Sequence, residues 1–453
     1  MNKPILFAIL LTATFFFVVG CAEEPQHQIV NNELKDTFAL RPFPQAQNNP
    51  VHPGAVRPTI RTQAQMNNDV AAVYRNFRNR FLGYVEVGGQ KRYFVNATGT
   101  GGAGTVTISE AHGYAMMIFA LMAGVEGFGD EREVFDGLNR LRRANPSVID
   151  DRLMSWTVYD ATLNLGPSNA ATDGCLDMAY ALILAHRQWG AQEYLNDAKR
   201  ILEGLKESAM HSSQAQHRTK LGDWHGAWGT VTEAYRTTSR SSDWRPSHFR
   251  AFAAVDDATF WLAAADTVYR LLAQVSNAQT GLMPDFIIGF NPARPVSNDL
   301  VFSNPTATWP SHFEALVSGE HNWGNFAMNA ARTPWFIAKD YMQHGTAAAR
   351  THLDKIISWL ENSTGSNPNN IASGYTLDGR KLSADLSTDG TSYESFSPIF
   401  AAPFASGMAA AGNQSFLNRT YSAISGTGVS DREYAMAIQL LNMILITGNW
   451  WIP

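Results

Sequence analysis

Carboxyl groups stand at the start of two long apolar stretches of this sequence. Glu110 precedes a run of mostly apolar residues that continues to residue 124, and Asp173 precedes a second run that continues to residue 189. A carboxyl group in apolar surroundings costs free energy unless it is paired, hydrogen-bonded or used in a reaction. Hydrolysis of a glycosidic bond needs two such groups, because one acid protonates the leaving oxygen while a second carboxylate activates water or attacks the sugar.

Two other segments gather charged and aromatic side chains. They contain Asp243, Trp244 and Arg245, and further along the chain Glu320, Asn329 and Arg332. Each charged residue also has a plain structural explanation, since a carboxylate favours the positive end of a helix and an arginine forms surface ion pairs. Only the convergence of several of these residues at one place indicates a catalytic site.

Other kinds of chemistry find little support in the sequence. His211, His217 and His225 are loosely spaced and form no HExxH motif, so we expect no metal, and no G-x-S-x-G segment provides a serine nucleophile. The glycine-rich residues 99–104 lack the Lys-Ser/Thr ending of a phosphate-binding loop, and we expect no cofactor. The net charge of -5 and the absence of a basic run argue against a nucleic-acid partner.

The apolar patterns predict helices of two kinds. Residues 111–122 are apolar almost all round, which predicts a helix buried on several sides, whereas residues 131–143 carry one apolar face. The same alternation recurs at 171–189 and 193–207, at 330–341 and 346–361, and at 396–411 and 414–424, with a first helix at 66–81 and a last one at 431–446. About a dozen helices of alternating character predict an all-α fold, an α/α barrel of helical hairpins with a site in its long loops. A helical solenoid is the competing architecture, but no fixed period supports it.

The N-terminus reads as a targeting segment. Lys3 is followed by an apolar stretch at 5–19 and by Cys21, which resembles a bacterial lipoprotein signal (residues 1–21) with lipidation at Cys21. A signal peptide without lipidation is the alternative. Residues 22–60 are rich in Pro, Asn and Gln and predict a flexible tether, which leaves 61–453 as the globular domain. We therefore expect an exported monomer that meets the membrane, at the periplasmic or outer cell surface, only through its lipid anchor.

Six motifs in the same order resemble those of glycoside hydrolase family 8. They are SEAHGYAM at 109–116, LMSW at 153–156, ATDGCLDMAYALILAHRQW at 171–189, SDWRPSHFRAF at 242–252, NAARTPW at 329–335 and TGNWW at 447–451. The resemblance extends over about residues 60–453. It implies an (α/α)6 barrel of six helical hairpins and inverting hydrolysis of a β-1,4-linked glycan such as cellulose, mixed-linkage β-glucan, chitosan or xylan.

The resemblance also implies roles for individual residues. Glu110 corresponds to the general acid, for which we expect a raised pKa, and Asp173 corresponds to the aspartate that binds and distorts the sugar. One branch of the family has an aspartate as base where this chain has Asn329, whereas a second branch, which includes chitosanases, uses a glutamate slightly upstream. Glu320 is therefore the candidate base and Glu314 the reserve.

Further residues are candidates for contacts with the glycan. Arg332 is expected to position the sugar and the acid, and Asp285 is a candidate cleft residue. The aromatic candidates for stacking on sugar rings are Trp156, Trp244, Tyr393 and Phe396. Cys175 departs from the family signature, which has an aspartate at this position.

Three functional hypotheses follow. The first is an endo-acting inverting glycanase, with β-glucan or cellulose favoured as substrate, chitosan next and xylan possible in principle. The second, motivated by Asn329, is a glycan-binding lipoprotein that kept the cleft and lost the base. The third is a different α/α-barrel enzyme such as a lyase, against which the order of the motifs argues.

Overall fold

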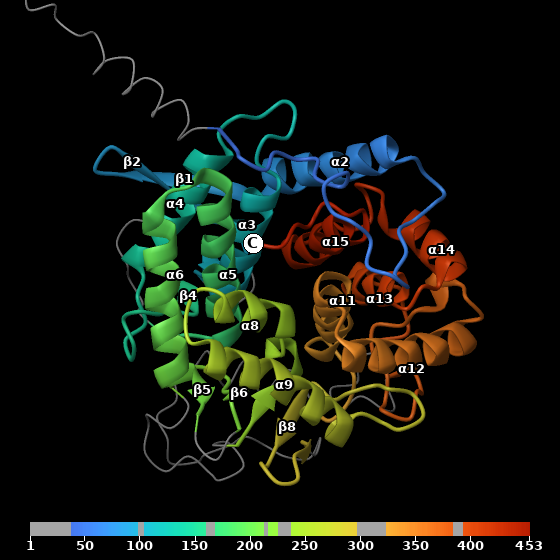
Figure 1. Cartoon of the computed structure of the whole chain (residues 1–453). Coiled ribbons are helices and arrows are strands. Elements are labelled where there is room, and N and C mark those ends of the chain that lie inside the picture. Colours follow the sequence, from blue (N-terminus) through green and yellow to red (C-terminus); the bar gives the residue numbers. More distant parts are fainter. Residues whose placement is uncertain are drawn as a thin grey trace, which may run out of the picture. The chain divides into compact units, whose positions relative to one another are not determined.

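The computed structural model describes residues 38–97, 104–159, 168–212, 216–224, 237–296, 323–383 and 393–453. The chain divides into an N-terminal unit, Met1–Phe38, and a compact unit, Ala39–Pro453, which contains every element described below. The described residues form twelve α-helices and several short strands (Figure 1).

The helices of the compact unit form two concentric rings. The inner ring consists of α3 (Ser109–Leu121), α5 (Thr172–Trp189), α8 (Pro246–Ala253), α11 (Thr333–His344), α13 (Pro398–Ala410) and α15 (Glu433–Ile446). The outer ring consists of α2 (Gln63–Phe81), α4 (Glu131–Ala144), α6 (Gln192–Gly204), α9 (Ala258–Val275), α12 (Ala347–Thr364) and α14 (Gln414–Ile424). Each inner helix contacts the next, and α15 closes the ring against α3. The expected (α/α)6 barrel is confirmed, and its sixth pair joins the first helix, α2, to the last, α15.

Burial separates the two rings as the patterns predicted. In α3, every residue except Glu110 is buried, whereas α4 alternates between buried and accessible positions and α12 buries a single face. Two glycines let α3 and α5 approach closely. A Cβ atom at Gly174 would lie 2.5 Å from the backbone of Ser109, and one at Gly113 would lie 2.7 Å from Asp177 Cβ. This close packing brings the first turns of α3 and α5, with Glu110 and Asp173, side by side.

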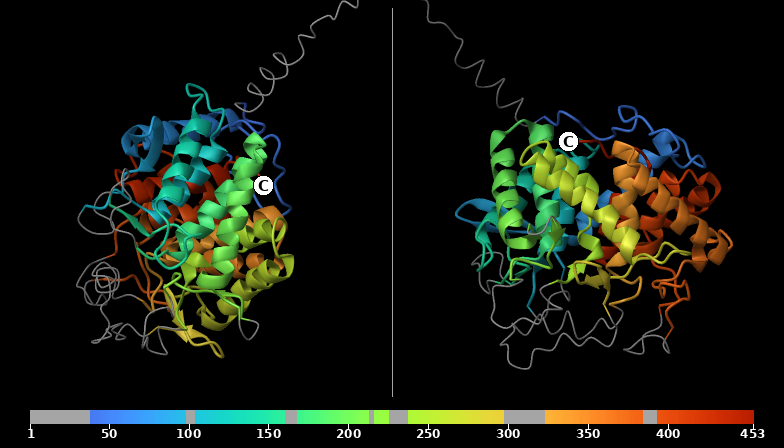
Figure 2. Two further views of the ribbon diagram at one scale, coloured as in Figure 1. Left: turned by 90° about the vertical axis from the view of Figure 1, so that its left-hand side faces the viewer. Right: turned by 60° about the horizontal axis from the view of Figure 1, so that its bottom comes forward.

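The connections at the two ends of the barrel differ in length. Most inner helices pass to outer ones through short links, such as residues 190–191 and 345–346. Most outer helices return through long segments, such as 145–171 and 276–332, and the exception is the short return 425–432 from α14 to α15. All inner helices therefore begin at the end that has the long connections (Figure 2). That end is where the sequence predicted the site.

Short strands fix these long connections. The hairpin β1 (Leu82–Val87) and β2 (Gln90–Val95) is antiparallel, and β3 (Thr107–Ile108) pairs with β4 (Thr157–Val158) immediately before Glu110. A second pair joins β5 (Met210–His211) to β6 (Arg218–Thr219), and β8 (Phe286–Ile288) lies between β7 (Ser239–Arg240) and β9 (Arg294–Pro295). The short helical turns η1 (Leu205–Ala209), η3 (Ser241–Asp243), η4 (Ala330–Arg332) and η5 (Pro368–Asn370) complete the described connections.

The expected tether is too long. Residues 39–60 belong to the compact unit, where Phe43 and Ala46 are buried and the backbone amides of Gln45 and Ala46 donate to Asn449 Oδ1 at 2.9 and 3.1 Å. Hydrogen bonds hold this segment where apolar side chains are few, and composition does not reveal such bonds. Within the described ranges, no helix is long and apolar enough to span a membrane.

Candidate active site

Glu110 lies in the first turn of α3, at the mouth of the barrel. Its position is fixed by the β3–β4 pairing and by the backbone amide of Ser109, which donates to the carbonyl oxygen of Trp156 at 2.8 Å. Its side chain is the one partly accessible group of α3, with 14% of its surface exposed. The carboxylate contacts Arg332 and accepts a hydrogen bond from the Tyr114 hydroxyl at 3.1 Å. Glu110 is thus a supported carboxyl group that solvent, or a substrate, can reach.

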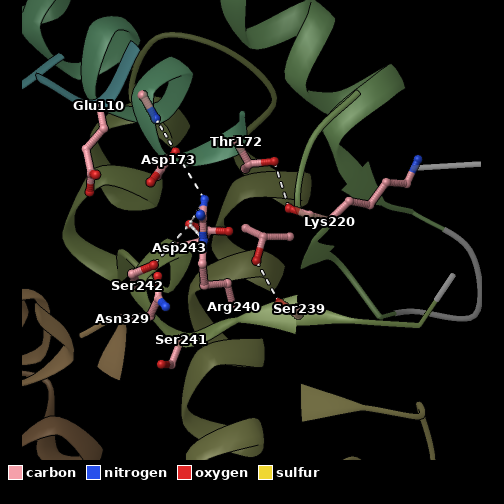
Figure 3. A network of polar contacts seen from close by, with 12 residues as sticks. Glu110, Thr172, Asp173, Lys220, Ser239, Arg240, Ser241, Ser242, Asp243 and Asn329 are labelled. Atoms are coloured by element: carbon pink, nitrogen blue, oxygen red, sulfur yellow. Dashed lines mark hydrogen bonds and ion pairs between the residues drawn. The ribbon is translucent and has the colours of Figure 1, made fainter. Parts of the chain in front are cut away.

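Asp173 occupies the matching position in the first turn of α5. Its Oδ2 lies 3.8 Å from Arg332 Nη1, the same nitrogen that contacts Glu110, and its Oδ1 lies 3.1 Å from Arg240 Nη2. Figure 3 shows the two acidic side chains extending from neighbouring helices. Because both carboxylates approach the same nitrogen of Arg332, Asp173 lies beside Glu110. The acid and base of an inverting enzyme are instead about 6.5–9.5 Å apart, on opposite sides of the sugar. The position of Asp173 therefore suits a role in binding the sugar rather than the role of the base.

A buried carboxyl group supports Asp173 from behind. Arg240 Nη2 lies 3.1 Å from Asp243 Oδ1 as well as from Asp173, so one guanidinium bridges the two acids (Figure 3). Asp243 is fully buried, and burial raises the pKa of its carboxyl to about 8, although Arg240 opposes the shift. At neutral pH Asp243 is therefore mainly protonated, and the charge of Arg240 is left to balance Asp173.

Asp285, Asn329 and Arg332 form a chain of hydrogen bonds that leads to the acid. Asp285 accepts from the backbone amides of Ala327, Asn329 and Ala330 at 3.0, 3.1 and 2.7 Å, and from Asn329 Nδ2 at 3.1 Å. Asn329 Oδ1 in turn accepts from Arg332 Nη2 at 2.9 Å. The expected place of Asp285 in the cleft is wrong, because its side chain is buried under the 327–330 segment, where burial raises its pKa to about 6 despite these bonds.

A third arginine lies beneath these groups. Arg245 is fully buried, contacts Asp177 one helical turn after Asp173, and interacts electrostatically with the hydroxyl of Tyr114. Tyr114 therefore lies between Arg245 and Arg332, whose Nη1 donates to its hydroxyl oxygen at 3.3 Å.

Two further residues at the mouth were missed by sequence reasoning. Tyr434, in the first turn of α15, places its ring 5.6 Å from the Arg332 guanidinium and stacks at 6.4 Å on Tyr114. The neighbouring Glu433 is 8% exposed, and its Oε1 has no hydrogen-bond partner among the described residues. Burial raises the pKa of its carboxyl to about 8. The residue patterns around α15 gave no sign that it carries cleft residues.

The aromatic candidates divide into two groups. Trp244 is buried and donates from Nε1 to Ser239 Oγ at 3.2 Å, and Trp156 is only 8% exposed. Trp244 therefore presents no free face to a sugar, and its prediction as a stacking platform is wrong, whereas Trp156 stays a candidate. Tyr393 and Phe396 are half-buried in the segment that precedes α13 and remain candidates.

The remaining predicted residues lie outside the described ranges. Glu320, Glu314 and Cys21 fall within 297–322 or 1–37, so the candidate base and the lipidation site stay predictions. Within the described part, the structure brings Glu110, Asp173, Asn329 and Arg332 together. An α/α barrel that carries an accessible, arginine-supported acid and a neighbouring carboxylate at its mouth defines a glycan-processing site.

Comparison with known proteins agrees with this class. Residues 84–295 match the model of glycosyl hydrolases family 8. A beta-glucanase of Niallia circulans is 30% identical over 419 residues, which cover 91% of each chain, and an endoglucanase of Bacillus sp. strain KSM-330 is 31% identical over 91% of this chain and 82% of the relative. The chain belongs to glycoside hydrolase family 8.

Solved structures show the same relationship. The apo beta-1,3-1,4-glucanase of Paenibacillus sp. X4 superposes with a TM-score of 0.76 at 30% identity and covers 91% of this chain and 99% of its own. A xylanase from Teredinibacter turnerae, solved with xylohexaose, has a TM-score of 0.68 at 16% identity, covers 90% of this chain and 100% of its own, and shares the fold. The chain is therefore a glycoside hydrolase.

Proposed function

We propose that this enzyme hydrolyses internal β-1,4 bonds of a neutral β-glucan with inversion of configuration. Glu110 protonates the leaving oxygen, while Asp173 binds the sugar at the cleavage point, and Arg332 holds both carboxylates in place. A base outside the described ranges, for which Glu320 is the candidate, activates the water. The names of the two relatives, beta-glucanase and endoglucanase, support a glucan as the substrate.

We propose a neutral glycan as the substrate because the carboxylates at the mouth are paired with arginines. Among the described residues, Glu110 contacts Arg332 and Asp173 contacts Arg240. The deeper Asp177 has Arg245 as its partner. A chitosan chain carries ammonium groups and is favoured by unpaired carboxylates, which this arrangement does not offer. Burial also raises the pKa of Asp243 and Glu433 to about 8, so neither adds much negative charge at neutral pH.

Asn329 fits a working hydrolase as well as a disabled one. Its amide donates to Asp285 and accepts from Arg332, so it has a positioning task that an aspartate could not perform in the same place. These two hydrogen bonds support a positioning role for Asn329 in a working hydrolase, with the base supplied elsewhere.

A panel of polymers tests the substrate. The purified protein is incubated with mixed-linkage β-glucan, carboxymethyl cellulose, chitosan and xylan, and new reducing ends and viscosity are followed. We expect reducing ends and an early fall in viscosity with a β-glucan, because internal cleavage shortens chains quickly. Preferential cleavage of chitosan would contradict the charge argument, and tight oligosaccharide binding without any cleavage would support the glycan-binding alternative.

We also propose that the enzyme is an exported monomer anchored by a lipid on Cys21. The support is the apolar stretch before Val18, Val19, Gly20 and Cys21. Metabolic labelling with palmitate should mark the wild type and not Cys21→Ala, and size-exclusion chromatography of the detergent-extracted protein should give a single-chain mass after the micelle is subtracted. Labelling of both proteins alike would refute the anchor.

A further inference from the structure

A ladder of fully buried polar side chains descends from the site between α5, α8 and α11. Arg245 contacts Asp177, whose Oδ1 lies 3.3 Å from His248 Nε2, and His248 Nδ1 lies 3.5 Å from Lys339 Nζ. None of these side chains is exposed to solvent. Burying charged groups is costly, and they persist where each has a partner.

Charged and polar groups flank both ring nitrogens of His248. Asp177 Oδ1 lies 3.3 Å from Nε2, and Lys339 Nζ lies 3.5 Å from Nδ1. Burial, with the nearby charges of Lys339 and Arg245, holds the pKa of His248 well below its ordinary value, and burial lowers the pKa of Lys339 in the same way. Lys339 also lies 3.7 Å from the ring of Tyr180. The ion pair of the upper ladder is therefore Asp177 with Arg245.

The top of the ladder reaches the catalytic acid through Tyr114. Arg245 donates from Nε to the carbonyl oxygen of Ser242 at 3.1 Å and interacts electrostatically with the Tyr114 hydroxyl. Burial raises the pKa of Tyr114 well above its ordinary value, so the hydroxyl keeps its proton. With positive charge on two sides, from Arg245 and Arg332, that proton is directed to Glu110 Oε1, 3.1 Å away.

We propose that Asp177 is a positioning residue for the reaction: it neutralises and orients Arg245, which in turn holds the Tyr114 hydroxyl against Glu110. Asp177 itself lies too deep to touch the glycan. This inference rests on the proposed role of Glu110 as the acid. It assigns a role to Asp177, which lies one helical turn after Asp173 on the same face of α5.

A double-mutant cycle tests the proposal. Asp177→Asn, Tyr114→Phe and the double variant are compared with the wild type on whichever polymer the wild type cleaves, with kcat, KM and thermal unfolding measured for each. The matched control is Asp340→Asn. Asp340 is also fully buried and bonds an arginine, Arg250 Nε, at 2.9 Å. It interacts electrostatically with Lys339 at the lower end of the ladder, and no contact is recorded between it and Arg245 or Tyr114 within the described ranges.

We expect Asp177→Asn to lower kcat about tenfold, the effect of weakening one charge-assisted contact in the transition state, with KM within about twofold. The double variant should be no slower than Tyr114→Phe alone, and Asp340→Asn should keep the wild-type kcat per folded molecule. Multiplicative effects in the double variant, or a normal kcat in folded Asp177→Asn, would overturn the proposal. If Asp177→Asn does not fold, Arg245→Lys takes its place in the cycle, since it keeps the charge but cannot bridge Asp177 and Tyr114.

A second readout separates this proposal from the proposed function. If the wild type cleaves no polymer, the proposed function fails, but the carbon-13 shift of the Glu110 carboxyl, identified with Glu110→Gln, still reports on the ladder. We expect that signal to move in Asp177→Asn and to stay in place in Asp340→Asn. An unchanged signal in both variants would refute the positioning role.

Discussion

Replacing Asn329 by aspartate separates two accounts of this position. The amide of Asn329 donates to Asp285 Oδ2 at 3.1 Å and accepts from Arg332 Nη2 at 2.9 Å. Asn329→Asp keeps the acceptor for Arg332, loses the donor, and places two carboxylates in contact. If Asn329 is a lost base, the substitution should restore or raise turnover. If it is a positioning residue, the substitution should impair the enzyme.

The size of the effect follows from the geometry. Two charges 3.1 Å apart repel each other by about 5 kcal/mol at an effective dielectric constant of about 20. Proton uptake limits this cost. Since the pKa of Asp285 is raised to about 6 by burial, protonating it at pH 7 costs about 1.4 kcal/mol. The bonds that Asp285 accepts from backbone amides also weaken when its charge is lost, which adds about 1 kcal/mol. We expect a loss of about 2–3 kcal/mol in the free energy of unfolding and a kcat several-fold below that of the wild type.

The chain offers a closely matched control. Asn139 is buried on α4, donates from Nδ2 to Asp197 at 2.7 Å and accepts from Arg142 Nε at 2.9 Å, the same arrangement of aspartate, asparagine and arginine far from the cleft. Asn139→Asp should cost less stability, because Arg142 and Arg143 both pair with Asp197, and it should leave kcat unchanged. Urea unfolding and reducing-end release measure the two quantities. An Asn329→Asp variant that turns over faster than the wild type would refute the positioning role.

Three other outcomes are expected. Tyr114→Phe should lower kcat about tenfold and leave KM nearly unchanged, because it removes one hydrogen bond to Glu110. Steady-state kinetics on β-glucan measure both constants, and an unchanged kcat would argue against that contact. Asp243→Asn mimics the protonated acid. Because the pKa of Asp243 in the folded state is raised from 3.8 to about 8, the wild type loses stability as the pH rises between these values. The melting temperature of the variant relative to that of the wild type should therefore increase from pH 5 to pH 9. A difference in melting temperature that does not change with pH would contradict the raised pKa. Gly174→Ala should lower the free energy of unfolding in urea by more than about 2 kcal/mol and lower activity, because its Cβ would lie 2.5 Å from the Ser109 backbone. A variant as stable as the wild type would show that α3 and α5 can move apart.

Most of the fold could be predicted from the helical periodicity of apolar residues. The alternation of all-round and one-sided apolar helices follows from whether a helix lies in the inner or outer ring, so local patterns sufficed to predict the barrel. The first turns of α3 and α5 brought Glu110 and Asp173 together for the same reason. Tyr114 and Asp177 lie four residues after Glu110 and Asp173, one helical turn below them, so this spacing could have identified both.

Other parts of the site depend on contacts between distant segments, which periodicity does not encode. Arg240 reaches Asp173 from a strand of another connection, and Tyr434 reaches Arg332 from the last helix. The burial of Asp285 arises from backbone amides more than forty positions away in the chain. The packing of residues 39–60 is likewise set by hydrogen bonds to Asn449, at the other end of the chain.

The anomer that is released first tests most directly whether Glu110 is the acid of an inverting hydrolase that acts on β-glucan. Proton NMR during the first minutes of β-glucan hydrolysis identifies the anomer released, and the same experiment is repeated with Glu110→Gln. We expect the wild type to release the α-anomer first and the variant, with unchanged thermal stability, to release almost none. Initial release of the β-anomer, or near-normal hydrolysis by Glu110→Gln, would contradict this expectation.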